Sequence, residues 1–280
     1  MPSSVQDTQP DAIPFRSMAM FLLLTFGIAW GVLAAFIFFP ETMVGLFGEI
    51  TGEHPLFYLA VWAPAISAFV VILRWSGLEG LRRHLGRALL WRCSWPWYAF
   101  LLLGVPLVFF AGSFFKGNLS EATFPFASVS SFLLALALIA IKGPIEEFGW
   151  RGLALPLLQR KMAPVWAALV IGVIWGLWHT PAFLLSGTEQ SAWSFLPFFT
   201  GTIALSVIVT PLFNASRGSI LLPGVFHFML INPVWPDAQP YDTYIFALIA
   251  IVIVWLHRES MFTRTDSVVE VVPDKQWTHS

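Results

Sequence analysis

Long apolar runs separated by short polar connections dominate the whole chain. A membrane-spanning helix needs roughly 20 apolar residues to cross a hydrocarbon core of about 30 Å. Eight runs approach this length, and each is predicted to form a transmembrane helix: 18–39, 55–73, 97–115, 131–150, 165–185, 193–213, 219–235 and 243–257. The pattern therefore predicts an all-α integral membrane protein with about eight transmembrane helices.

Prolines fall inside four of these runs, and we expect kinks at Pro64, Pro106, Pro197 and Pro223, since neighbouring membrane helices can tolerate them. The first run is too long for the apolar core of a signal peptide, so it is predicted to remain as a membrane helix.

Composition supports a membrane protein and limits the alternatives. Of the 280 residues, 57% are hydrophobic and 11% are charged, whereas a soluble domain carries about 25% charged residues. The net charge of -1 indicates nothing about nucleic acid, and since no basic tract is long enough to suggest it, no nucleic-acid partner is predicted. The single Cys93 excludes an intrachain disulfide and any zinc site made of several cysteines.

Charge in the connections predicts the orientation. Cytoplasmic loops of membrane proteins are enriched in Lys and Arg. If both termini are cytoplasmic, nearly all basic residues lie on that side, with Lys116 outside and Lys142 within the fourth run. The cytoplasmic set is Arg16, Arg74, Arg82, Arg83, Arg87, Arg92, Arg151, Arg160, Lys161, Arg217, Arg258, Arg264 and Lys275. We therefore expect a multi-pass protein of a prokaryotic plasma membrane.

The domain organisation expected is simple. A polar cytoplasmic tail, 1–17, precedes one polytopic membrane domain, 18–257, and a polar cytoplasmic tail, 258–280, follows it. The second tail is expected to be poorly ordered. Residues 77–95, which mix leucine with arginine, form either an interfacial helix on the cytoplasmic surface or a plain basic loop.

Few acidic residues or histidines lie inside the apolar runs away from their ends, and those that do need partners. They are Glu146 and Glu147 in the fourth run, His179 in the fifth and His227 in the seventh. A charged group at the membrane centre costs at least about 2.5 kcal/mol, although neutral histidine costs less. We therefore expect the four to meet in one polar cavity between helices 4, 5 and 7.

Helix geometry assigns the two glutamates different roles. Adjacent residues of a helix point about 100° apart, and Arg151 follows Glu147 at the i,i+4 spacing of an ion pair. Glu147 and Arg151 are therefore predicted to be a structural pair, which leaves Glu146 as the candidate reactive carboxylate.

This set of residues can activate water. A carboxylate with an imidazole beside it can take a proton from a water that attacks a carbonyl, and a second imidazole can stabilise the oxyanion. Alternatively, Glu146, His179 and His227 could bind Zn²⁺ with an open fourth position. There is no H-E-x-x-H pattern, so the residues leave both mechanisms open.

The motifs resemble those of a known superfamily. E-E-x-x-x-R (Glu146, Glu147 and Arg151), aromatic-x-x-x-H (Trp175 and His179) and the later His227 are similar to the three motifs of the CAAX-protease and bacteriocin-processing (CPBP) superfamily. The similarity covers about 146–232 and implies a CAAX-protease-like core of about 131–235.

The resemblance also implies roles for individual residues. Glu146 would be the base that activates water, with His179 as its partner and His227 at the oxyanion site. Glu147 and Arg151 would support the fold, and Trp175 takes a place where phenylalanine is usual. The polar residue expected four positions after His227 is replaced by Ile231, so Asn232, one position later, becomes the candidate.

Three functional classes follow. The leading hypothesis is an intramembrane endopeptidase that acts on a peptide or protein entering from the membrane or the cytoplasmic side. The second is a non-catalytic scaffold or immunity factor of the same fold, which Ile231 favours. The third is a proton-coupled transporter, because buried Glu and His also serve proton relays. Membrane lipid is an expected partner, and the oligomeric state stays open.

Overall fold

A computed structural model describes residues 13–121 and 124–274, and every regular element in these ranges is helical. Six segments are long and apolar enough to cross a membrane: Ser17–Phe38, Ala63–Leu89, Trp95–Lys116, Val129–Gln159, Pro164–Leu184 and Phe195–Ala215. Two shorter apolar helices, Leu221–Leu230 and Tyr241–Leu256, accompany them. The predicted fold class, an all-α multi-pass membrane protein, is confirmed.

The first half of the chain contains seven α-helices in the described residues. They are α1 (Ser17–Phe38), α2 (Pro40–Phe47), α3 (Pro55–Val61), α4 (Ala63–Gly86), α5 (Trp95–Ala99), α6 (Val105–Lys116) and α7 (Val129–Ala140). A 3₁₀ turn, Arg87–Leu89, follows α4, and a π-helical turn, Phe100–Gly104, joins α5 to α6.

The second half begins with a series of short elements and continues with longer helices. In order these are a 3₁₀ turn (Gly143–Glu146), α8 (Glu147–Gly149), a π-helical turn (Trp150–Ala154), α9 (Leu155–Gln159), α10 (Pro164–Trp178), α11 (Phe195–Ala215), α12 (Leu221–Leu230), α13 (Tyr241–Leu256) and α14 (Arg258–Phe262). Short 3₁₀ turns at Thr180–Leu184 and Glu189–Ala192 connect α10 to α11.

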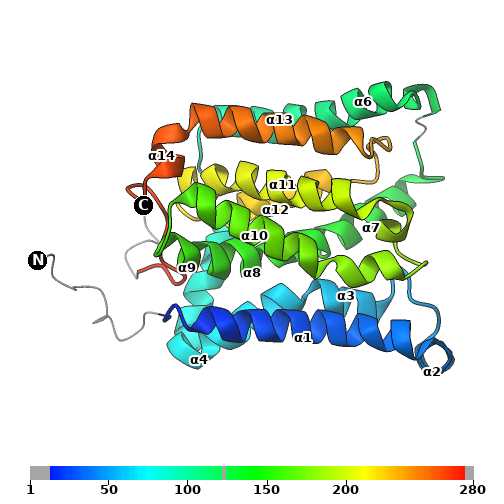
Figure 1. Cartoon of the computed structure of the whole chain (residues 1–280), viewed down its shortest axis with the longest axis horizontal. Helices are drawn as coiled ribbons and strands as arrows, with labels where there is room; N and C mark the ends of the chain where they lie inside the picture. The colour runs from blue at the N-terminus through cyan, green and yellow to red at the C-terminus, as the bar shows by residue number, and fades with distance from the viewer. Residues whose placement is uncertain (1–12, 122–123, 275–280) are drawn as a thin grey trace, which may run out of the picture.

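Two apolar clusters hold the bundle together. The first joins α1, α3, α4 and the segment around α8 and α9 to α10, and the second joins α6, α11, α12 and α13. Helices α10 and α11 pack against each other between them, and Leu205 of α11 contacts both clusters. In Figure 1, α1 and α4 accordingly lie on one side of the bundle, and α6 and α13 lie on the other.

The expected second helix was wrong in its bounds, and proline explains the difference. The second span is not one helix over 55–73, because α3 ends at Val61 and α4 begins at Ala63 with Pro64 in its first turn. Pro197 and Pro223 also lie in the first turns of α11 and α12, where a missing N–H leaves no hydrogen bond unmade. Of the four prolines expected to kink helices, only Pro106 follows a distorted turn within a span.

The fourth span is broken where a regular helix over 131–150 was expected. Helix α7 ends at Ala140, Lys142 has non-helical angles, and helical structure resumes at Gly143 and continues to Gln159. Pro144 lies in the first turn of the new segment, where proline favours a helix start. Both glutamates therefore lie just after a break, within the interior of the span.

The tail expected to be poorly ordered is packed against the bundle up to Asp274. Helix α14 follows α13 almost directly, and Val271 is fully buried in the first apolar cluster. Arg160 donates hydrogen bonds to the carbonyl oxygens of Ile13 and Val269, so both ends of the described chain meet at one end of the bundle. Figure 1 shows this end at the left. Residues 1–12 and 275–280 lie outside the described ranges.

The stretch 77–95 is mostly helical and contributes to the interior. Helix α4 changes direction at Gly77, which has a φ of 62°, and then continues to Gly86. His84 and Arg87 are buried there, although either a surface helix or a loop was expected to expose them.

Close packing of α8 on α4 predicts a stability effect. A methyl group added at Gly149 would lie 2.5 Å from the carbonyl oxygen of Pro64, and such overpacking costs about 1–3 kcal/mol. We expect Gly149→Ala to lower the thermal unfolding temperature in detergent. Gly27→Ala, on an open face of α1, is the matched control and should leave that temperature unchanged or raise it. Equal unfolding temperatures for the two variants would contradict this account of the α4–α8 contact.

Candidate active site

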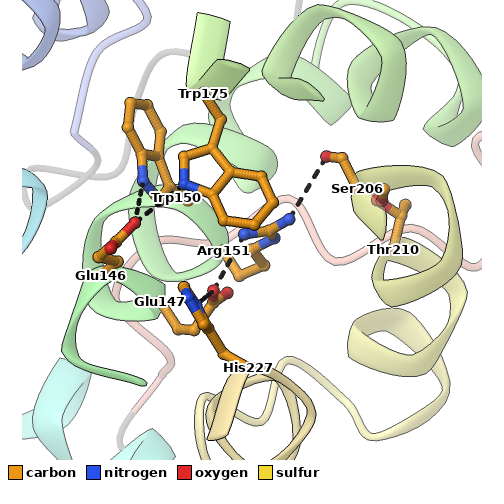
Figure 2. Close-up of polar contacts among 8 residues, drawn as sticks. All are labelled: Glu146, Glu147, Trp150, Arg151, Trp175, Ser206, Thr210 and His227. Carbon is orange, nitrogen blue, oxygen red and sulfur yellow. Dashed lines mark hydrogen bonds and ion pairs between the residues drawn. The ribbon is translucent and has the colours of Figure 1, made fainter. Parts of the chain in front are cut away.

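The carboxylate of Glu146 is held by two tryptophans. Its Oε2 accepts hydrogen bonds from Nε1 of Trp175 at 2.9 Å and from Nε1 of Trp150 at 3.3 Å. All three side chains are buried, and Figure 2 shows both indoles directed at the same oxygen. Because both hydrogen bonds use Oε2, Oε1 is left to bind a water or a substrate group.

The neighbouring Glu147 binds two basic side chains through one oxygen. Its Oε1 lies 3.0 Å from Nη1 of Arg151 and 2.8 Å from Nδ1 of His227. Glu147 and Arg151 are each 2% exposed, so the predicted i,i+4 pair is present and lies out of contact with water. His227 was expected beside Glu146, yet its hydrogen bond goes to Glu147.

Arg151 extends this network to two further helices. Its guanidinium lies 5.0 Å from the ring centroid of Trp175, and its Nη2 is 3.4 Å from Oγ of Ser206 on α11. The arginine therefore lies in the interior, although its charge was counted with the cytoplasmic loops.

Close approach of α12 to the break in the fourth span positions His227. A Cβ atom at Gly143 would lie 2.6 Å from Cδ2 and Nε2 of the His227 ring, so only glycine leaves room for the imidazole. Nε2 of His227 therefore lies next to the main chain three residues before Glu146, while Nδ1 is fixed by Glu147.

His179 is connected to Glu146 through Trp175. Its Nδ1 lies 2.7 Å from the carbonyl oxygen of Trp175, and a carbonyl can only accept, so Nδ1 carries a proton and Nε2 of the neutral ring is an acceptor. The imidazole also packs edge-on against Trp178 and Phe198. Trp175 thus contacts Glu146 with its side chain and His179 with its main chain.

Asn232 is placed differently from the other candidates. Helix α12 ends at Leu230, and Oδ1 of Asn232 accepts a hydrogen bond from the amide of Val234 at 3.1 Å, which closes a turn. Its side chain therefore takes no part in the contacts that join Glu146, Glu147 and His227 in the described structure.

The zinc alternative finds little support in the arrangement of donors. Within 13–121 and 124–274, no group of three or more His, Cys, Asp or Glu side chains is arranged so that it could hold a metal ion. Glu146, His179 and His227 instead form hydrogen bonds to different protein groups. The residues present do not fit a three-ligand zinc site.

Two contacts of the site were missed in the sequence. Trp150 follows Glu146 by four residues, which is the same spacing that identified the Glu147–Arg151 pair and could have indicated it. Ser206 contacts Arg151 from a distant helix, and no local pattern pointed to it.

Comparison with known proteins finds a family match over the region that carries the site. Residues 125–231 match the family model described as type II CAAX prenyl endopeptidase Rce1-like. This region contains Glu146, Glu147, His179 and His227 and ends one residue before Asn232. Over this region the chain is therefore similar to the CAAX prenyl endopeptidase family.

Two kinds of curated relative match more than half of the chain at low identity. "CAAX prenyl protease 2" of Methanococcus maripaludis is 27% identical over 177 residues, which cover 59% of this chain and 62% of the relative. "Lysostaphin resistance protein A" of Staphylococcus haemolyticus is 26% identical over 219 residues, or 72% of this chain and 56% of the relative. The Staphylococcus aureus Newman protein of the same name is 27% identical and is covered over 48% of its length. The matches thus span about half to three fifths of these relatives.

The buried Glu147–Arg151 pair predicts a large stability effect. Arg151→Ala leaves the carboxylate of Glu147 buried without its guanidinium, and breaking a buried pair in this way costs about 3–5 kcal/mol. We expect a large fall in the thermal unfolding temperature, measured by tryptophan fluorescence in detergent.

Arg82→Ala is the matched control, because Arg82 is exposed on α4 and surface substitutions usually change stability by less than about 0.5 kcal/mol. If the two variants unfold at the same temperature, the Glu147–Arg151 pair does not stabilise the fold.

Proposed function

We propose that this protein is an intramembrane endopeptidase of the CAAX-protease type, which hydrolyses a peptide bond with a water activated by Glu146. The observation that carries the proposal is the Glu146 carboxylate, buried in a membrane protein, fixed through Oε2 by two indole N–H groups and left with Oε1 for a water. The similarity of residues 125–231 to the CAAX prenyl endopeptidase family supports a peptidase.

The proposed reaction uses three side chains. A water bound to Oε1 of Glu146 gives its proton to the carboxylate as its oxygen attacks the peptide carbonyl carbon, and the carboxylic acid then passes that proton to the leaving amine. His179, whose Nδ1–H is tied to the carbonyl of Trp175, presents Nε2 as an acceptor that can orient the water. His227 would stabilise the oxyanion through Nε2–H as the imidazolium, because its Nδ1–H already donates to the carboxylate of Glu147.

Three further residues have supporting roles in this proposal. Glu147 and Arg151 keep His227 in place and stabilise the fold, and Trp175 holds Glu146 and His179 together. Asn232 was a candidate for the oxyanion site, and we leave it out of the proposed mechanism because its Oδ1 accepts from the amide of Val234.

The substrate class and the location are also proposals. One relative is named a CAAX prenyl protease, so we propose a peptide or protein that enters from the lipid or from the cytoplasmic side, with or without a prenyl group. The basic connections favour both termini in the cytoplasm of a prokaryotic cell.

Replacement of Glu146 tests the mechanism. We expect Glu146→Gln to lower cleavage of a library of prenylated and unmodified C-terminal peptides by about 10²–10⁴-fold, the usual contribution of a general base. Glu41→Gln, an exposed acid on α2, should cleave like the unmodified protein, and a chelator should have no effect. Full activity of Glu146→Gln would exclude the mechanism, and loss of activity in chelator would favour a metal.

The hydrogen bond from Trp175 to Glu146 gives a second test. Trp175→Phe keeps an aromatic ring and removes the indole N–H, and a hydrogen bond to a charged group contributes about 1.5–3 kcal/mol, which corresponds to about 10–100-fold in cleavage rate. Trp178→Phe is the matched control, because Trp178 is buried on the same helix and its Nε1 has no hydrogen-bond partner in the described structure. Equal cleavage rates for the two variants would mean that the indole does not position Glu146.

A second candidate function is a non-catalytic scaffold or immunity factor. The relatives named lysostaphin resistance protein A match 72% of the chain, and the polar residue expected after His227 is replaced by Ile231. A resistance or partner-binding phenotype that survives replacement of both Glu146 and His179 would select this function.

A further inference from the structure

The C-terminal segment, residues 263–274, lies across the end of the bundle where both described termini meet (Figure 1). It contains no helix or strand and runs between the last part of α4 and α9. Most of its side chains are exposed or half-buried, whereas Val271 is fully buried.

Side chains of the bundle bind the main chain of this segment at successive residues. Gln159 donates to the carbonyl oxygen of Val268 at 2.8 Å, and Arg160 donates to that of Val269 at 2.7 Å. Nη1 of Arg87 lies 3.1 Å from the carbonyl oxygens of Glu270 and Val271.

Helix α4 supplies two further contacts. Nδ1 of His84 lies 3.0 Å from the carbonyl oxygen of Val271, and Nη1 of Arg83 lies 3.1 Å from that of Pro273. We call these five donors the carbonyl clamp: Arg83, His84, Arg87, Gln159 and Arg160.

These contacts have the features of peptide recognition through the main chain. Every non-proline residue offers the same carbonyl and amide, so donors aimed at carbonyl oxygens bind an extended chain largely independently of its sequence. Selectivity then comes from the side chains that pack against the bundle, of which Val271 is fully buried, while Val268 and Val272 are partly buried. Asn214 completes the arrangement, since its Oδ1 accepts from the amide of Val268 at 3.1 Å.

The clamp also contacts the segment that carries the glutamates. Nη1 of Arg87 lies 3.3 Å from the carbonyl oxygen of Gly152, and Gly152 directly follows Arg151. A change of occupant in the clamp could therefore alter the contact of Arg87 with Gly152, one residue from the buried ion pair.

We propose that the carbonyl clamp is a peptide-binding site, that residues 268–273 are its resident occupant, and that a second extended peptide with a valine-like residue in the Val271 position can replace them. The partner is thus an extended, sequence-tolerant segment with one branched apolar side chain. This inference goes beyond the endopeptidase proposal and does not depend on it.

The test uses the full chain and a fluorescent synthetic peptide of residues 263–274, TRTDSVVEVVPD. Val271→Asp places a charge at the fully buried Val271 position and should release the resident segment. This variant is therefore expected to bind the added peptide, as measured by fluorescence anisotropy in detergent. Thr265→Asp introduces the same charge at an exposed position. The Thr265→Asp variant and the unmodified protein should both bind the peptide at least about tenfold more weakly than the Val271→Asp variant. In both proteins the tethered segment competes with the peptide at millimolar effective concentration.

Two further observations decide the outcome. The same peptide carrying Val271→Asp should not bind any of the three proteins. A folded Val271→Asp variant that binds no peptide would overturn the proposal, as would equal binding by all three proteins.

Hydrogen exchange on the unmodified protein tests the proposal if Val271→Asp does not fold. An exchangeable occupant opens locally, so amides of residues 267–272 should exchange at least about tenfold faster than those in the middle of α10 and α11. An excess of unlabelled peptide should leave the α10 and α11 rates unchanged. If the amides of residues 267–272 exchange only as fast as those in the middle of α10 and α11, the segment is a fixed part of the fold, and the proposal is overturned.

Discussion

The shared oxygen of Glu147 is the contact on which the arrangement of the site depends. Taking a carboxylate and a guanidinium out of water costs several kcal/mol for each ion, and only good geometry with further hydrogen bonds offsets this cost. Here Oε1 of Glu147 binds Arg151 and His227, and Arg151 continues to Ser206 and to the ring of Trp175. The pair thereby links the broken fourth span to α10, α11 and α12. Helices α10 and α11 contribute to both apolar clusters, and α12 contributes to the second.

This network gives the two adjacent glutamates different environments. Glu147 is neutralised by basic partners, whereas the hydrogen bonds recorded for Glu146 come from neutral indoles. A carboxylate whose hydrogen bonds come from neutral donors keeps its capacity to take a proton from water. The break at Gly143 and Pro144 makes this possible, because it lets the ring of His227 approach the main chain beside the first glutamate.

The end of the bundle where the described termini meet uses basic residues in another way. Arg87 and Arg160 were counted as charges that orient the protein in the membrane, and both also bind carbonyl oxygens of the C-terminal segment. Arg87 additionally reaches Gly152 in the glutamate-bearing span. Through Arg87, the clamp at the end of the bundle therefore contacts the residue that follows Arg151 of the buried pair.

Apolar run length and the positions of buried ionisable residues determined the membrane class, the candidate residues and the Glu147–Arg151 pair, because burial in lipid and i,i+4 spacing are local rules. Only the tertiary structure decided that His227 binds Glu147, that Trp150 and Ser206 join the network, and that Asn232 closes a turn. It also decided that the second tail packs against the bundle through Val271. These contacts join residues of different helices, or depend on where prolines begin a helix, and neither spacing nor hydropathy along the chain records which side chains the packing of α10, α11 and α12 brings together.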